Sequence, residues 1–186
     1  MGTTVATNAL LERKRENTLL AITSGFADIL RIGYQQRPKL FSLDINLPDM
    51  LYSKIIEIEE RVDVNGKILT KLDVLKSKKL LKSAFNEGYK SIAIVLLHGY
   101  RYQDHENKLK LIAKEIGFKQ ISVSHNVSPL MKIIPRGDTT VVDAYLSPIL
   151  RRYVAQVKNA LGSDKNDFGK LKFMQSNGGL TDANYF

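Results

Sequence analysis

The chain has 186 residues, of which 44% are hydrophobic, and carries a formal net charge of +9 at pH 7. This length is enough for one well-packed core, and the apolar content excludes a disordered chain. The absence of cysteine excludes disulfides, thiolate catalysis and cysteine-ligated metal, and it fits a reducing compartment. The longest apolar run, residues 92–97, is too short to span a membrane, and we find no signal peptide. We therefore expect a globular protein of the cytoplasm.

Seven of the lysines lie on two predicted helices. The spacing of these lysines is that of a solvated outer face, and no aromatic stacking motif is interleaved with them. The lysines concerned are Lys76, Lys78, Lys79, Lys82, Lys108, Lys110 and Lys114. We therefore do not expect a nucleic-acid partner.

The first half of the chain begins with a predicted helix over residues 3–14, capped by Thr3 or Thr4. A strand over 18–23, a short helix over 26–32 and a long loop over 33–48 follow. A loop of this length in a compact domain is often functional.

The middle of the chain alternates strands and helices. A strand is predicted over 55–62, followed by a hairpin turn at Asn65-Gly66, because both residues tolerate a positive φ. Asp73 begins an amphipathic helix that ends at Gly88, and its inward face is formed by Leu75, Leu80, Leu81, Ala84 and Phe85.

In the second half, an apolar strand over 91–97 precedes a helix over 104–116 and a strand over 121–124. Residues 135–138 interrupt the chain, and Asp138 or Thr139 then caps a long helix over 140–160. Together these elements predict an α/β fold with helices on both faces of a mainly parallel sheet. Its strands lie near 18–23, 91–97, 120–124 and 170–174.

The sequence contains no complete catalytic set, so the catalytic residues remain unassigned. His98 and His125 each follow a strand, and the carboxyl ends of parallel strands are where α/β proteins bind ligands. His105 is placed at the surface, and no histidine has a metal-ligand spacing. Arg37 and Arg136 lie in predicted loops, where a guanidinium can clamp a carboxylate. There is no Walker loop, no Gly-x-Gly-x-x-Gly and no Gly-x-Ser-x-Gly motif.

Several stretches, spread over nearly all of the chain, together resemble the hydantoinase/5-oxoprolinase family. They are residues 2–13, 25–33, 60–62, the segment around His98, 135–137, 143–146, 152–154 and 176–180. The combination of Pro135-Arg136-Gly137 with Asp143-Ala-Tyr resembles the 5-oxoprolinase branch. Hydantoinase-type subunits usually carry a Glu-Arg pair and Asn-Ala-Tyr there. Asn126 departs from that branch, which tends to have glutamate at this position, and this puts activity in question if that acid is catalytic.

The resemblance implies ATP-dependent opening of a cyclic amide, in which 5-oxo-L-proline becomes L-glutamate. A lactam is a poor electrophile, so phosphorylation of its amide oxygen makes the ring carbon open to attack by water. Family members have an actin-like ATPase (ribonuclease H-like) architecture with two Asp-x-Gly-Gly-Thr phosphate loops, and this sequence contains neither.

The resemblance therefore implies an internal piece of a larger enzyme, whether a truncated chain or the product of a broken gene. Residues 1–162 would be the N-terminal region and 163–186 the start of the next domain. ATP and Mg²⁺ would serve the whole enzyme, and neither is expected on this piece, which we expect to be inactive alone. Its partners would be the rest of the enzyme, a small cyclic amide and further copies in a homo-oligomer.

The site implied by this resemblance is a single cleft that holds the cyclic substrate beside the ATP phosphates. Arg136 is the first candidate to bind the substrate carboxylate, and Arg37 the second. The residues expected to face the cleft are Thr3, Thr4, Asn8, Arg37, His98, His125 and Arg136, with Asn177 and Gly178 beside the nucleotide. Two other readings remain open: a hydantoinase-type subunit that acts on a different ring, and a non-enzymatic binding module with a basic face.

Overall fold

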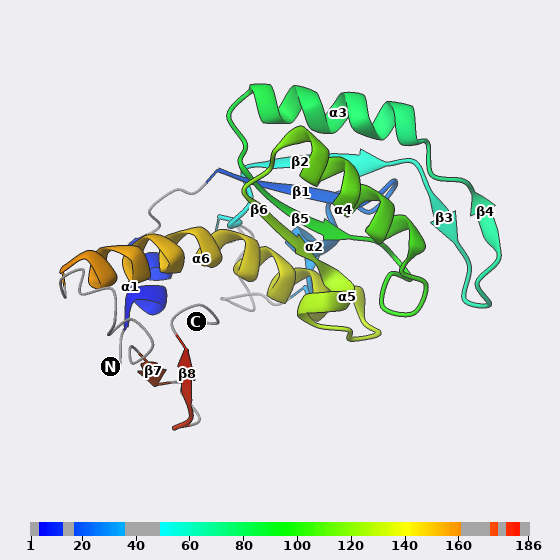
Figure 1. The fold of residues 1–186 in the computed structure, drawn as a ribbon. Helices are drawn as coiled ribbons and strands as arrows, with labels where there is room; N and C mark the ends of the chain where they lie inside the picture. Colours follow the sequence, from blue (N-terminus) through cyan, green and yellow to red (C-terminus); the bar gives the residue numbers. More distant parts are fainter. Residues whose placement is uncertain (1–3, 13–16, 36–48, 161–171, 175–177, 183–186) are drawn as a thin grey trace, which may run out of the picture. The chain divides into compact units, whose positions relative to one another are not determined.

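The computed structural model describes residues 4–12, 17–35, 49–160, 172–174 and 178–182. Within residues 17–145 it contains a parallel β-sheet with helices on both faces (Figure 1). The sheet contains β1 (Thr18–Thr23), β2 (Lys54–Ile58), β5 (Ser91–Val95) and β6 (Gln120–Val123), in the order β2-β1-β5-β6. All of these strands run parallel. The predicted fold class is therefore confirmed.

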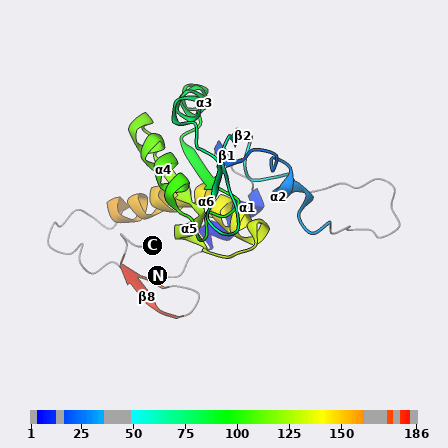
Figure 2. The same ribbon diagram turned by 90° about the vertical axis from the view of Figure 1, so that its right-hand side faces the viewer.

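The central strands are apolar on both sides because each face of the sheet is covered. Leu19 and Ala21 of β1 pack with α3 (Val74–Asn86) and α4 (Asp104–Ile116). Leu20 and Ile22 point to the other face, where they pack with α2 (Ile29–Ile32) and the first part of α6 (Ile133–Ala160). Figure 2 shows α3 and α4 on one side of the sheet and α2 on the other.

The helix signals predicted from the sequence are present around α3 and α4. The Asp73 carboxylate accepts a hydrogen bond from the Lys76 amide at 2.9 Å and caps α3. Gly117 ends α4 with a φ of 103°. The lysines of these two helices that were assigned to a solvated face are all exposed. The prediction that Leu75 faces inward is wrong, because this side chain is 82% exposed in the first turn of α3.

Two predicted strands differ from those observed. The strand predicted over 55–62 is divided: β2 ends at Ile58, and β3 (Arg61–Val62) pairs antiparallel with β4 (Ile68–Thr70). The strand predicted near 170–174 is not part of the parallel sheet. It is β7 (Lys172–Met174), which pairs antiparallel with β8 (Leu180–Asp182) because the short link 175–179 cannot make a parallel crossover.

Residues 135–138 do not form a break between regular elements but lie in the first turns of α6. The predicted start of this helix at residue 140 is therefore wrong. Pro135 is tolerated there because the first N–H groups of a helix have no intrahelical acceptor. Gly137 is needed for packing: a Cβ at this position would lie 2.6 Å from Leu30 Cδ2. Thr139 does not cap a helix, because its hydroxyl donates back to the Pro135 carbonyl at 2.8 Å.

A second compact unit comprises Met1–Glu16 together with Leu146–Phe186, while Asn17–Tyr145 forms the first. Within the second unit, α1 (Val5–Glu12) buries Ala9, and Val154 of α6 packs with Phe173 of β7. α5 (Ser124–Val127) is a single helical turn of the first unit that directly follows β6. None of the helices that the structure describes is long and apolar enough to cross a membrane.

The β3–β4 hairpin is attached to the body of the first unit through Tyr102. The Tyr102 hydroxyl donates to the Val64 carbonyl at 3.1 Å, and Gly66 turns the hairpin with a φ of 88°. A Cβ on Gly66 would lie 2.6 Å from Tyr102 Cε1, so the glycine also makes room for the ring.

A positive φ costs an L-residue about 1–2 kcal/mol. We expect Gly66→Ala to lower the free energy of unfolding by more than this amount. Gly25→Ala is the matched control, because Gly25 has a φ of 85° but no atom within 4 Å of the added Cβ. The excess should be about 1 kcal/mol, the value of the hydrogen bond lost when Tyr102 moves. Urea unfolding of both variants measures it, and equal losses would show that Tyr102 does not contact the turn.

Candidate functional site at the carboxyl edge of the sheet

The strand order changes direction between β1 and β5. After β1 the chain passes to α2 on one face of the sheet, and after β5 it passes to α4 on the opposite face. In open α/β sheets ligands bind at the carboxyl ends of strands where the connections diverge in this way. The residues that follow β1 and β5 are therefore the first place to look for a site.

Buried polar side chains gather at this carboxyl edge, and we call them the carboxyl-edge network. They come from β1, the segment after β2, α4, α5 and α6. Their members are Thr23, Glu60, His105, Glu106, Ser124, His125 and Arg136, all less than 9% exposed.

Glu106 is the centre of one half of the carboxyl-edge network. Its Oε1 accepts from the Leu96 amide at 2.9 Å and from the Ser124 hydroxyl at 2.7 Å. Its Oε2 lies 2.6 Å from His125 Nδ1, which carries the proton because a carboxylate can only accept. The carboxylate thus joins the ends of β5 and β6 to the start of α4. This arrangement satisfies a charge that is otherwise costly to bury.

Glu60 is the centre of the other half. Its Oε1 accepts from the Thr23 hydroxyl at 2.6 Å, and its Oε2 lies 2.7 Å from His105 Nδ1. The Thr23 oxygen in turn accepts from the Leu97 amide at 2.9 Å. β2 ends at Ile58, two residues before Glu60. The Glu60 carboxylate therefore lies at the carboxyl end of β1, where it binds Thr23, which in turn binds the segment after β5.

Arg136 is fully buried and binds the main chain. Its NH2 donates to the carbonyls of Leu96 at 2.5 Å and Leu97 at 2.9 Å. Its NH1 donates to the carbonyls of Leu130 at 2.7 Å and Met131 at 3.1 Å. Burial lowers the pKa of the guanidinium, and the negative charge of Glu106 acts in the opposite direction.

His98 lies immediately after these fixed residues. Its ring is half-buried and has no hydrogen-bond partner among the described residues, and the Tyr100 ring lies 6.4 Å away. Gly99 follows, and a Cβ at this position would clash with the Glu106 carboxylate. An imidazole held at this edge can donate to, or accept from, a bound molecule.

The structure places the predicted site residues as follows. His125 and Arg136 lie at the carboxyl edge, where they bind Glu106 and the Leu96 carbonyl, and His98 follows β5 at the same edge. Thr4, Asn8 and Gly178 belong to the second compact unit, where all three are exposed. Thr3, Arg37 and Asn177 lie outside the described residues. The single cleft that contains all of them stays a prediction, as does the contact of Arg136 with a substrate carboxylate.

Sequence reasoning missed Thr23, Glu60 and Glu106, and it placed His105 at the surface. That placement is wrong, because His105 is only 5% exposed and is hydrogen-bonded to Glu60. A local signal did exist for one pair. His105 and Glu106 lie in the first turn of α4, directly after a strand and its loop, where a parallel sheet brings side chains to its carboxyl edge.

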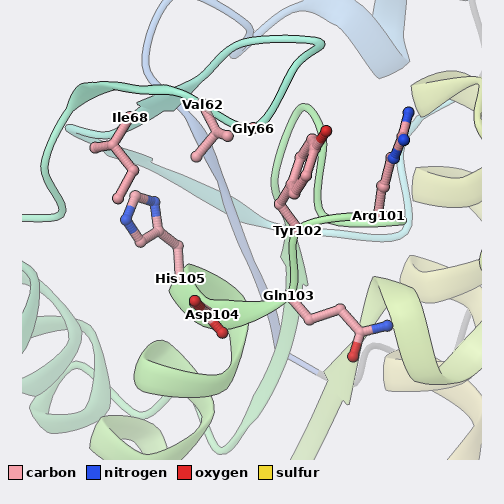
Figure 3. A pocket seen from close by; sticks show the side chains of 8 residues that line it. All are labelled: Val62, Gly66, Ile68, Arg101, Tyr102, Gln103, Asp104 and His105. Carbon is pink, nitrogen blue, oxygen red and sulfur yellow. The ribbon is translucent and has the colours of Figure 1, made fainter.

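A cavity of about 310 Å³ lies between the β3–β4 hairpin and the loop before α4 (Figure 3). Val62, Gly66 and Ile68 line it from the hairpin, and residues 101–105 line it from the loop and the first residues of α4. Among the described residues, His105 is the member of the carboxyl-edge network that reaches this cavity. No group of three or more His, Asp or Glu side chains in the described part of the chain is arranged to hold a metal ion.

Comparison with known proteins identifies the chain's relatives. It is 40% identical to the 5-oxoprolinase of Dictyostelium discoideum, with 100% of this chain and 17% of that protein covered. It is also 40% identical to 5-oxoprolinase 1 of Arabidopsis thaliana, with 100% of this chain and 16% of that protein covered. The chain thus spans about one sixth of the length of these curated relatives.

A solved structure supports the same relationship. The ATP-dependent caprolactamase of Pseudomonas jessenii matches with a TM-score of 0.82 and 27% identity, over 98% of this chain and 27% of that one. The model of the hydantoinase/oxoprolinase N-terminal region matches residues 1–117, and the hydantoinase/oxoprolinase model matches residues 136–186. The chain therefore belongs to the hydantoinase/oxoprolinase family.

Proposed function

We propose that this chain is part of an ATP-dependent 5-oxoprolinase, which opens the ring of 5-oxo-L-proline to give L-glutamate. The observation that carries the proposal is 40% identity over the whole chain to proteins named 5-oxoprolinase in two organisms. The caprolactamase α-subunit, whose name specifies a different lactam, is 28% identical over 96% of this chain. The proposal therefore favours 5-oxoproline as the ring.

We propose that the nucleotide site of the complete protein lies outside the residues of this chain that the structure describes. The sequence contains no Asp-x-Gly-Gly-Thr loop, and the described carboxylates do not form a metal-binding group. We therefore assign ATP and Mg²⁺ to the complete protein. When bound there, ATP supplies the phosphoryl group that activates the amide oxygen.

The contribution that we propose for this chain is to bind and orient the cyclic amide at the carboxyl edge of the sheet. His98 is the residue best suited to contact the substrate, because its ring is half-buried and has no hydrogen-bond partner among the described residues. A neutral or protonated imidazole can donate a hydrogen bond to the ring carboxylate or the amide oxygen. Roles for Arg37, Thr3, Thr4, Asn8, Asn177 and Gly178 stay predictions, as do a homo-oligomer and a cytoplasmic location.

We expect the isolated 186-residue chain to release no phosphate from ATP, with or without 5-oxoproline. Phosphoryl transfer depends on donors and a metal positioned around the phosphates. The assay is phosphate release by purified protein with Mg²⁺ and ATP. The complete protein should release phosphate faster when 5-oxoproline is added. Phosphate release by the isolated chain that 5-oxoproline accelerates would show that this chain contains the whole catalytic apparatus.

A second candidate is a lactam or hydantoin hydrolase of the same family, which the TM-score of 0.82 with caprolactamase favours. The complete protein can be assayed with 5-oxoproline, caprolactam and hydantoin in parallel. Preference for either of the last two rings would replace 5-oxoproline in the proposal. A basic binding module is not favoured, because several exposed lysines already pair with surface carboxylates, as Lys76 does with Glu59 and Lys78 with Glu115.

A further inference from the structure

The backbone between β5 and His98 is held by side chains in place of the sheet. β5 ends at Val95, so Leu96 and Leu97 lie beyond the paired part of the strand. Their amides donate to Glu106 and to Thr23, both at 2.9 Å. Both of their carbonyls accept from the same guanidinium nitrogen, Arg136 NH2. The backbone N–H and C=O groups of Leu96 and Leu97 therefore each have a buried side-chain partner.

The three side chains that hold Leu96 and Leu97 are themselves fixed. Glu106 is bound by residues of α5, and the Thr23 hydroxyl donates to Glu60. Arg136 is also bound to the carbonyls of the segment before α6. Movement of the backbone of Leu96 and Leu97 would thus break contacts to β1, α4 and α6 together.

This arrangement is more elaborate than stability alone requires. Buried ion pairs and triads can often be replaced by apolar residues without loss of stability, because each charge must be desolvated. Here the oppositely charged side chains of Glu106 and Arg136 and the Thr23 hydroxyl are buried, and they fix the backbone of two residues. Sites that must hold a side chain accurately are built with such a supporting layer.

The next residue is His98, whose ring lies near the Tyr100 ring but has no hydrogen-bond partner among the described residues. We infer that Thr23, Glu106 and Arg136 are positioning residues that fix Leu96 and Leu97 so that His98 is presented to the substrate. The identity of that substrate rests on the proposed function. The fixing of the backbone does not, and it can be measured separately.

The first arm of the test is amide hydrogen exchange, measured by NMR on the chain as it is. Thr23→Val removes the acceptor of the Leu97 amide, so this amide should exchange about tenfold faster, the equivalent of one hydrogen bond. Thr23→Ser keeps the hydroxyl and should restore protection. Ser122→Ala is the matched control: it removes a buried hydroxyl that donates to Asp143 at 2.6 Å, but it does not touch Leu97.

The second arm uses the complete protein. Thr23→Val should lower kcat/KM for the cyclic amide by about tenfold. Thr23→Ser and Ser122→Ala should stay near wild type, and the KM for ATP should not change. If Thr23→Val does not fold, Thr23→Cys, with its weaker acceptor, gives the same comparison at smaller amplitude.

The outcomes separate the two proposals. Unchanged exchange of Leu97, or faster exchange without any change in kcat/KM, would overturn the positioning role while the proposed function stands. An equal loss in Ser122→Ala would also overturn it, because the effect would then be one of general stability. A wild-type complete protein that is inactive on 5-oxoproline but active on another ring would overturn the proposed substrate and leave the exchange result intact.

Discussion

Arg136→Met is expected to lower the free energy of unfolding by about 3–5 kcal/mol, the loss typical when one partner of a buried charged network is removed. Methionine fills much of the same volume but leaves four main-chain carbonyls without the guanidinium. It also removes the positive charge that interacts with Glu106. The measurement is urea unfolding followed by circular dichroism.

Arg31→Met is the matched control for this substitution, because Arg31 is exposed on α2. It should change the free energy of unfolding by no more than about 0.5 kcal/mol. Arg136→Lys should fall between the two, because an ammonium cannot span carbonyls on both sides as a planar guanidinium does. An Arg136→Met protein as stable as the Arg31→Met control would show that the carbonyls do not depend on Arg136.

The fold was predictable where the signals are local. The apolar run of β5, the Asp73 cap and the turn at Gly66 are each encoded within a few residues, and all three are present. Residues 135–138 show the limit of such signals. Proline and glycine usually interrupt a helix, but here one lies in the first turn and the other allows Leu30 to approach closely.

The candidate site was predictable only in part. The rule that parallel strands end at one edge places His98 and His125 at the carboxyl edge of the sheet, where the structure has them. The buried acids could not be found in the same way. The roles of Glu60 and Glu106 depend on partners 37 and 10 residues away, Thr23 and Leu96, which no local pattern identifies. Arg136 was predicted to bind a substrate carboxylate, whereas the acceptors observed for its guanidinium are main-chain carbonyls 5–40 residues away in the sequence.

His98→Ala in the complete protein is expected to have the largest effect on activity. The ring makes no hydrogen bond to a described residue, so its loss should change the free energy of unfolding by only about 0.5 kcal/mol. A hydrogen bond to a charged group is worth about 1.5–3 kcal/mol, so losing one to the substrate carboxylate should raise its KM at least about tenfold. Tyr102→Phe is the control on the same loop, since it removes only the hydroxyl that binds Val64.

The most direct test is therefore the KM of the complete protein for 5-oxoproline and for ATP, measured by phosphate release for wild type, His98→Ala and Tyr102→Phe. We predict that His98→Ala raises the KM for 5-oxoproline about tenfold or more and leaves the KM for ATP unchanged, while Tyr102→Phe changes neither. Equal changes in both constants, or no change in either, would contradict a substrate site at the carboxyl edge of this sheet.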